Sequence, residues 1–242
     1  MSYSNGPRII TDGLVLCLDA ANSKSYSGSG TAWNDLSSNG YNATLTNSPS
    51  FISNNFSFDG TNDYVAVSSP SNRFSWTPSG VGMNSMSIEL WVKSSDTNGY
   101  YISKPWNGGG EYNYTVTHNS FNCRVGVAGG GGEIYGMSFS SLATNNWEHI
   151  VCITTPTQMA VYRNGVIGTN FSNHSITNNV PTNGNGNLSL CIMTLYPYGE
   201  GWAGITSHAV SGNMSNFKLY NRLLSANEVL QNYNAIKGRF SL

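Results

Sequence analysis

Paired carboxylates are the first chemistry to look for in this sequence, because they catalyse glycoside hydrolysis. Retaining glycosidases hold two carboxyl groups about 5 Å apart, one as nucleophile and one as general acid/base. The strand-like run 89–93 has a single acid, Glu89, followed by Leu-Trp-Val-Lys. Asp59 and Asp63 are close in sequence, but they flank an Asp-Gly turn, and no G-x-S-x-G motif supports a nucleophilic serine. We therefore expect no enzyme and no catalytic residues.

Three glycine-rich segments, 108–112, 129–135 and 198–202, combine glycine with tyrosine or tryptophan. None precedes a predicted helix, which argues against a phosphate-binding loop. Glycine lets a backbone approach a partner closely, and aromatic rings offer flat faces to sugar rings. Two alternatives stay open: the aromatic rings fold inward over the core, or the same surface contacts a protein. The candidate ligand-binding residues are Trp106, Tyr112, Tyr196, Tyr198 and Trp202.

Oxygen donors are clustered in one loop, where Asp59, Asn62 and Asp63 could hold Ca²⁺. The alternative is an Asx-type turn, in which these side chains bond their own backbone. We expect no other cofactor. The four cysteines are widely spaced and form no CxxC pair, which argues against zinc and redox motifs and predicts buried, reduced thiols.

Charge is sparse: 10% of the 242 residues are charged, and 11 basic and 12 acidic side chains give a net charge of −1. This balance offers no basic surface for nucleic acid and no polybasic membrane patch. Asn, Ser and Gly together supply 93 residues, so the surface is polar but uncharged. No apolar run is long enough to span a membrane, and the first residues lack the apolar region of a signal peptide. We expect synthesis in a cytoplasm.

Short apolar runs recur about every ten residues and predict about a dozen strands without alternating helices. In the run 86–93, Met86, Ile88, Leu90 and Val92 share one face, while Ser, Glu, Trp and Lys share the other. We expect the apolar face to lie between the sheets. The whole pattern is typical of an all-β, two-sheet antiparallel sandwich.

Two turns are predicted to close hairpins. Asn164-Gly165 stands between apolar runs and favours a type I′ turn, in which both residues take positive φ. The runs 56–58 and 64–67, separated by an Asp-Gly turn, predict a second hairpin with a longer loop.

One short C-terminal helix is predicted from about residue 225 to 236. Ser225 and Glu228 form a capping box, and Gly238 can end the helix. We expect the helix to close one edge or end of the sandwich. No linker divides the chain, so we predict an N-terminal arm over residues 1–12 and one domain over residues 13–242.

Seven motifs follow one another along nearly the whole chain. They are Gly13–Leu16 leading into Leu18-Asp19-Ala20, Trp33-Asn34-Asp35-Leu36-Ser37, Phe58–Val65, Met86–Val92, Trp147-Glu148-His149-Ile150, Val161–Gly165 and Leu219–Ser225. In this order and spacing, residues 13–238 resemble the laminin-G-like jelly roll of the concanavalin A-like lectin/glucanase superfamily. The resemblance implies two large antiparallel sheets packed face to face, a jelly roll.

The resemblance also bears on the candidate sites. Glucanases of the superfamily carry a Glu-x-Asp-x-x-Glu run on a strand; here Trp91 replaces the second acid and the third is absent. His149 follows Trp147 where the family also has histidine, and we expect it to be a packed, hydrogen-bonded strand residue. Members that bind Ca²⁺ often have acidic residues before the C-terminal helix, where this chain has Ser215-Asn216.

The head, residues 13–22, and the tail, residues 224–235, look most like the version found in structural proteins of tailed bacteriophages. This implies a non-enzymatic virion structural protein: a capsid decoration protein, head fibre or tail appendage, located on the virion in multiple copies. Its partners would be other virion proteins and, through a second surface, host-surface polysaccharide. The alternative is a free-standing carbohydrate-binding module or adhesin, and the third reading is a glycoside hydrolase.

Overall fold

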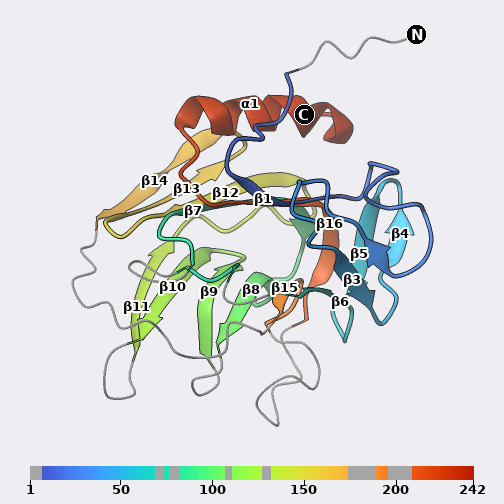
Figure 1. Ribbon diagram of the computed structural model, residues 1–242, viewed down its shortest axis with the longest axis horizontal. Coiled ribbons are helices and arrows are strands. Elements are labelled where there is room, and N and C mark those ends of the chain that lie inside the picture. The colour runs from blue at the N-terminus through green and yellow to red at the C-terminus, as the bar shows by residue number, and fades with distance from the viewer. Residues whose placement is uncertain are drawn as a thin grey trace.

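The chain folds as two antiparallel sheets packed face to face, with a helical segment on the outer face of one sheet (Figure 1). The computed structural model describes residues 7–68, 73–76, 82–106, 111–126, 132–173, 189–195 and 209–242. The predicted all-β sandwich with a C-terminal helix is confirmed. Within these residues, no helix is long and apolar enough to cross a membrane.

The first sheet, here called sheet I, contains eight strands in the described residues and is the sheet that the helix covers. Its order is β14-β13-β12-β7-β16-β5-β4. β1 lies off this path and pairs with the part of β16 that β5 leaves unpaired. These strands are β1 (Leu14–Asp19), β4 (Ser50–Ile52), β5 (Asn55–Asp59), β7 (Met86–Ser94), β12 (Glu148–Thr154), β13 (Gln158–Arg163), β14 (Val166–Asn173) and β16 (Ser211–Tyr220).

The second sheet, sheet II, also has eight described strands, in the order β11-β10-β9-β8-β15-β6-β3-β2. The four-residue β3, Ala-Thr-Leu-Thr, and the two-residue β2 carried too little apolar pattern to be predicted. The strands are β2 (Ala32–Trp33), β3 (Ala43–Thr46), β6 (Tyr64–Val67), β8 (Tyr100–Trp106), β9 (Glu111–Thr117), β10 (Ser120–Gly126), β11 (Gly132–Ser138) and β15 (Leu190–Ile192).

The predicted register of β7 is confirmed. Met86, Ile88, Leu90 and Val92 are all fully buried in the core between the two sheets. The opposite face of the strand is not open, however: Trp91 is also fully buried, beneath the C-terminal helical segment. The alternation therefore identified the inner face but gave no indication that the outer face is covered.

The predicted hairpin between residues 56–58 and 64–67 is wrong. β5 pairs with β4 and β16 in sheet I, whereas β6 pairs with β3 and β15 in sheet II. Gly60, at a φ of 77°, turns the chain between the two layers. Phe58 and Val65 both point into the same core, so the two runs meet across the sandwich instead of side by side.

The Asn164-Gly165 turn is as predicted. Arg163 of β13 pairs with Val166 of β14, and the two residues between them have φ values of 49° and 80°. Both values are positive, as a type I′ turn requires.

The helix α1 spans Ala226–Ile236, and its capping box is confirmed. Ser225 Oγ accepts a hydrogen bond from the Glu228 amide at 3.3 Å, and the Ser225 amide donates to the Glu228 carboxylate at 2.7 Å. Gly238 does not end the helix; the chain continues as a 3₁₀ turn, η1 (Lys237–Phe240). α1 lies across the outer face of sheet I and not at an edge or end of the sandwich (Figure 1), because that face offers the apolar surface that packs against it.

A buried polar network joins α1 to sheet I. Lys218 Nζ donates to Glu89 Oε1 at 2.7 Å, and Asn232 Nδ2 of α1 donates to Glu89 Oε2 at 2.6 Å. His149 is fully buried, as expected, and its Nε2 lies 3.2 Å from Glu89 Oε1. The expected hydrogen bond is wrong, because the geometry of this contact falls short of one and neither ring nitrogen has a partner among the described residues. Burial alone would raise the pKa of Glu89, but Lys218 and His149 outweigh it and lower this pKa to about 2.

The described part of the predicted N-terminal arm is docked on this network. The Ile10 amide donates to Asn232 Oδ1 at 2.7 Å, and Tyr220 OH donates to the Ile10 carbonyl at 3.1 Å. Gln231 donates to the Arg8 carbonyl at 2.7 Å. Residues 1–6 lie outside the described residues, and the boundary at residue 12 stays a prediction.

Candidate functional site

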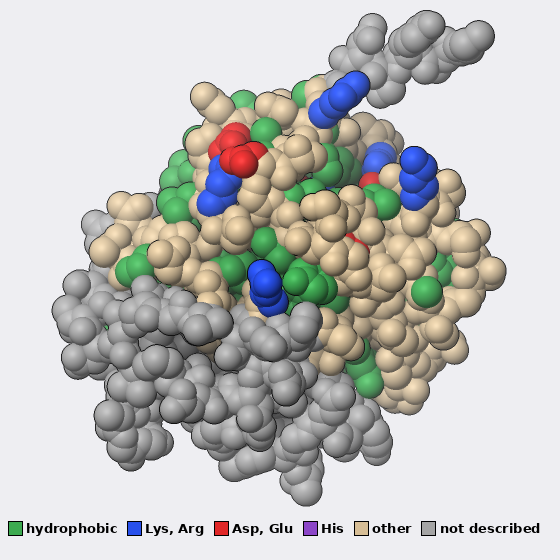
Figure 2. All heavy atoms as spheres, viewed as in Figure 1, with side chains coloured by type: hydrophobic (Ala, Val, Ile, Leu, Met, Phe, Trp, Pro, Cys, Tyr) green, Lys and Arg blue, Asp and Glu red, His purple; other side chains and the backbone are tan. Residues whose placement is uncertain are grey.

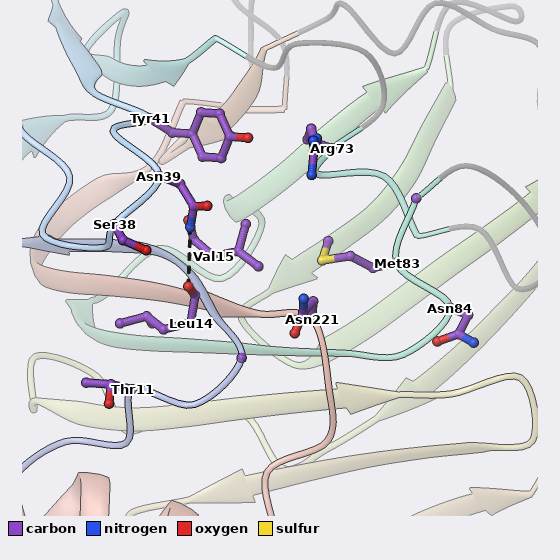
Figure 3. Close-up of a pocket in the computed structure, with 12 residues that line it drawn as sticks. Thr11, Leu14, Val15, Ser38, Asn39, Tyr41, Arg73, Met83, Asn84 and Asn221 are labelled. Carbon is purple, nitrogen blue, oxygen red and sulfur yellow. Dashed lines mark hydrogen bonds between the residues drawn. The ribbon is translucent and has the colours of Figure 1, made fainter.

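A polar pocket of about 690 Å³ opens at the start of β1, beside the loop that follows β2 (Figure 3). Its described lining comes from four segments that are distant in sequence. The lining residues are Thr11, Gly13, Leu14, Val15, Ser38, Asn39, Tyr41, Arg73, Gly82, Met83, Asn84 and Asn221.

The first wall is the loop 35–41, which Asp35 holds against β1. The Asp35 carboxylate accepts hydrogen bonds from the amides of Cys17 at 2.9 Å, Ser37 at 2.8 Å and Tyr41 at 3.0 Å. Asn39 adds a bond from its Nδ2 to the Val15 carbonyl at 2.9 Å. One buried strand and one acidic side chain thus set the position from which Tyr41 projects into the pocket (Figure 3).

The second wall consists of residues 73–76 and 82–84. Trp76 links these two segments. The Trp76 indole donates to the Asn84 carbonyl at 3.2 Å, and the Met83 amide donates to the Ser75 carbonyl at 3.0 Å. Asn113 of β9 accepts from the Trp76 amide at 2.6 Å and donates to the Trp76 carbonyl at 2.9 Å. This wall is therefore tied to sheet II.

Phe74 connects the two walls. Its ring is fully buried and lies edge-on to the Tyr41 ring, with 5.1 Å between centroids and 84° between planes. Edge-to-face pairs of this kind are favourable. Because Phe74 is anchored, its neighbour Arg73 is held at the pocket opposite Tyr41, and its side chain is exposed.

The floor requires glycine at residue 13. The Asn221 amide donates to the Gly13 carbonyl at 2.9 Å, which joins the segment before β1 to the segment after β16 below the pocket. Gly13 has a φ of 71°, and a Cβ there would lie 2.9 Å from Arg222 Cγ. A larger residue would be strained and would displace Arg222.

Several polar side chains face this pocket without a protein partner. The hydroxyls of Thr11, Ser38 and Tyr41 and the amides of Asn84 and Asn221 make no hydrogen bond with any residue that the structure describes. Hydroxyls and amides can each donate and accept. Convergent polar groups in a concave site are what a polyhydroxylated ligand needs.

The predicted aromatic site cannot be placed at this pocket. Tyr196, Tyr198 and Trp202 lie outside the described residues, as do the side chains of Trp106 and Tyr112. The backbones of the last two are described: Trp106 ends β8 and pairs with Glu111, and Tyr112 pairs with Pro105 at the same end of β9. This site stays a prediction.

The loop that holds the candidate Ca²⁺ donors Asp59, Asn62 and Asp63 contains the Asx-type turn that was the alternative prediction. Asp59 Oδ1 accepts from the amides of Thr61 at 2.7 Å and Asn62 at 3.3 Å, which lowers the pKa of Asp59. Burial and the neighbouring Asp59 charge raise the pKa of Asp63. Among the residues described, no group of three or more His, Cys, Asp or Glu side chains is placed to hold a metal ion.

Sequence reasoning missed the polar pocket, although part of it could have been found. The motif from Trp33 to Ser37, followed by an Asn-Gly turn, predicts a loop in which Asn, Asp and Ser side chains hydrogen-bond the nearby backbone. Arg73, Asn84 and Asn221 belong to no motif. Only the fold brings them into one pocket with Tyr41.

Sequence comparison places the chain in a family. A family model described as the concanavalin A-like lectin/glucanases superfamily matches residues 59–230. A search of curated proteins found no match.

Solved structures share the fold at low sequence identity. The binding domain of botulinum neurotoxin serotype D matches with a TM-score of 0.60 and 15% identity, over 93% of this chain and 52% of that chain. The binding domain of Paraclostridial Mosquitocidal Protein 1 matches with a TM-score of 0.63 and 16% identity, over 93% and 52%.

A Trypanosoma rangeli sialidase, solved in complex with 2,3-difluorosialic acid, matches with a TM-score of 0.64 and 14% identity, over 98% of this chain and 35% of that chain. The chain thus spans about half the length of the toxin domains and about a third of the sialidase. The family match covers well over half of the sequence, and the sandwich has the expected two-sheet form. The chain belongs to the concanavalin A-like lectin/glucanase superfamily.

Proposed function

We propose that this protein is a non-enzymatic carbohydrate-binding module and that the polar pocket holds the sugar. The observation that carries the proposal is the set of five hydroxyl and amide side chains that face the pocket without a partner in the described structure. A sugar offers hydroxyls that donate and accept in the same way, so it can satisfy all five groups.

The surface around the pocket supports a neutral, polar kind of recognition. Figure 2 shows few charged side chains on this face of the molecule, and most of its described atoms belong to uncharged polar groups or backbone. Tyr41 supplies a ring on which the apolar face of a sugar can rest. A volume of about 690 Å³ is within the usual range for small-molecule sites and leaves room for more than one sugar unit.

The related structures support binding in a general way. The two toxin matches are named as binding domains, and a further match is named as the receptor-binding domain of a botulinum neurotoxin C/D mosaic serotype. These relatives favour the reading of a carbohydrate-binding module or adhesin over a virion structural protein, because no match described above is a phage protein.

The absence of catalysis is part of the proposal. Glu89, the acid at the glucanase-like position, is fully buried under α1, and its two oxygens face Lys218, His149 and Asn232. A carboxylate engaged in this way supports a structural role for the strand.

A saccharide screen tests the proposal. Purified protein is offered neutral and acidic polysaccharides, and binding is measured by calorimetry. We expect at least one saccharide to bind and the double variant Tyr41→Phe/Asn84→Ala to weaken binding by about 5- to 150-fold, because each of the two lost hydrogen bonds contributes about 0.5–1.5 kcal/mol. Asn227→Ala, at an exposed position on α1, is the matched control and should leave binding unchanged.

Two results would contradict the proposal. If Trp106→Ala or Trp202→Ala abolishes binding while the Tyr41→Phe/Asn84→Ala variant binds normally, the sugar is held by the aromatic loops and not by the pocket. If no saccharide binds at millimolar concentration, the protein is not a carbohydrate-binding module.

A further inference from the structure

We infer that the saccharide is acidic and that Arg73 binds its carboxylate or sulfate group. The inference rests on the proposed function and adds the ligand class to it. The structural basis is an unpartnered guanidinium group at the rim of a pocket that otherwise presents neutral polar groups.

Arg73 is the one charged side chain among the described residues that line the pocket. It makes no ion pair or hydrogen bond with any residue of the described structure. A guanidinium group carries its charge at every accessible pH, so the pocket is permanently positive.

Three other arginines of this chain are paired with carboxylates. Arg163 lies 2.6 Å from Glu148, and Arg239 lies 2.7 Å from Asp19. Arg222 is 2.7 Å from Glu228. In a protein with 11 basic and 12 acidic side chains, an unpaired arginine inside a pocket stands apart from these three.

The carboxylates near the pocket are already engaged. Asp12, next to the lining residues Thr11 and Gly13, contacts Arg222 Nε at 2.8 Å. Asp35 accepts three backbone amides and the Ser37 hydroxyl. Residues 64–88, which include Arg73, contain no Asp or Glu. Among the residues that the structure describes, no acid is therefore paired with Arg73.

The geometry of arginine suits an oxyanion on a sugar. Its planar fork can donate two parallel hydrogen bonds to a carboxylate or to two oxygens of a sulfate. Tyr41, whose hydroxyl points toward Arg73, and Asn84, farther along the pocket, can then bind hydroxyls of the same saccharide (Figure 3). One charged contact and several neutral ones together select an acidic saccharide over its neutral counterpart.

Matched ligand pairs test the inference with the full chain. The pairs are polygalacturonate against its carboxyl-reduced form, sialyllactose against lactose, and glucose 6-sulfate against glucose. Affinity is measured by calorimetry for the unaltered protein and for Arg73→Gln and Arg73→Lys. Arg8→Gln is the control, because Arg8 is an exposed arginine that does not line the pocket.

We expect the acidic member of at least one pair to bind about 2- to 5-fold more tightly than its neutral partner, the upper part of the range for an exposed charged contact. Arg73→Gln should reduce that ratio to about one, Arg73→Lys should retain part of it, and Arg8→Gln should keep it unchanged. The uronate, sialyl and sulfate arms identify which oxyanion is recognised.

Three results would overturn the inference. Equal affinity for both members of every pair shows that the charge of the saccharide does not affect binding, although the proposed carbohydrate function would stand. A preference that survives in Arg73→Gln, or that Arg8→Gln also removes, shows that the oxyanion is bound elsewhere. Failure of every saccharide to bind overturns the inference together with the proposed function.

Discussion

Asn232 on α1 donates a 2.6 Å hydrogen bond to Oε2 of Glu89 in the middle of β7, although 143 residues separate the two in sequence. The same side chain accepts the amide of Ile10, so it connects the helix, the central strand and the N-terminal segment. Both Asn232 and Glu89 are fully buried. This contact explains how the outer face of sheet I can carry a buried carboxylate beneath a helix without leaving that carboxylate unpaired.

Replacing Glu89 should be strongly destabilising. Glu89→Gln removes the buried negative charge and leaves Lys218 unpaired, which we expect to lower the free energy of unfolding by about 3–5 kcal/mol. Chemical denaturation followed by tryptophan fluorescence measures the change. The double variant Glu89→Gln/Lys218→Met should recover much of the loss, while Asp12→Asn, at an exposed carboxylate, should cost under about 1 kcal/mol. A double variant as unstable as Glu89→Gln alone would show that packing, not charge, sets the cost.

The free energy of unfolding should also fall in acid, because the pKa of Glu89 is lower in the folded chain than in the unfolded chain. Its pKa is lowered from 4.5 to about 2 in the folded chain, so the unfolded chain takes up the proton first. The contribution of Glu89 is therefore present above about pH 4.5 and is lost as the pH falls toward 2. Denaturation at several pH values should show a smaller loss over this interval in Glu89→Gln/Lys218→Met. Identical pH dependence in both proteins would rule out Glu89 as the titrating group.

The helix cap offers a separate test. Ser225→Ala removes the side-chain oxygen that accepts from the Glu228 amide, and we expect it to cost about 0.5–2 kcal/mol. The thermal midpoint should fall accordingly, whereas Asn227→Ala, in the exposed first turn, should change it little. An unchanged midpoint in Ser225→Ala would mean that tertiary contacts alone hold α1.

The core register predicts the effect of a cavity. Ile88 is fully buried between the sheets, so Ile88→Ala should lower the free energy of unfolding by about 2–5 kcal/mol. Ile52 is 56% exposed, and Ile52→Ala serves as the control with a change within about 0.5 kcal/mol. Comparable effects of the two substitutions would contradict the assigned inner face of β7.

Thiol reactivity tests the predicted reduced cysteines. Cys17, Cys123, Cys152 and Cys191 are all free and buried, and burial raises the pKa of Cys17 to about 12. A thiol reagent at pH 8 should therefore react slowly with the folded protein and with four thiols per chain after denaturation without reductant. Recovery of fewer than four would reveal disulfides.

Local features were well determined by the sequence alone. The alternation of β7 identified Ile88 and Leu90 as core residues, since side chains of a strand point to opposite faces in turn. Asn164-Gly165 specified its turn because few residues tolerate positive φ, and Ser225 with Glu228 specified the start of α1. Each of these depends on residues within a few positions of one another.

The tertiary structure decided which local elements meet. It sent β5 and β6 to different sheets, covered Glu89 and Trp91 with the C-terminal helical segment, and brought Tyr41 and Arg73 to facing walls of one pocket. None of these follows from periodicity, because a strand's pattern says which face is apolar but not which strand lies beside it or what covers its other face. Packing the apolar faces of two sheets and one helix together selected these partners, and the polar pocket formed where four distant segments converge.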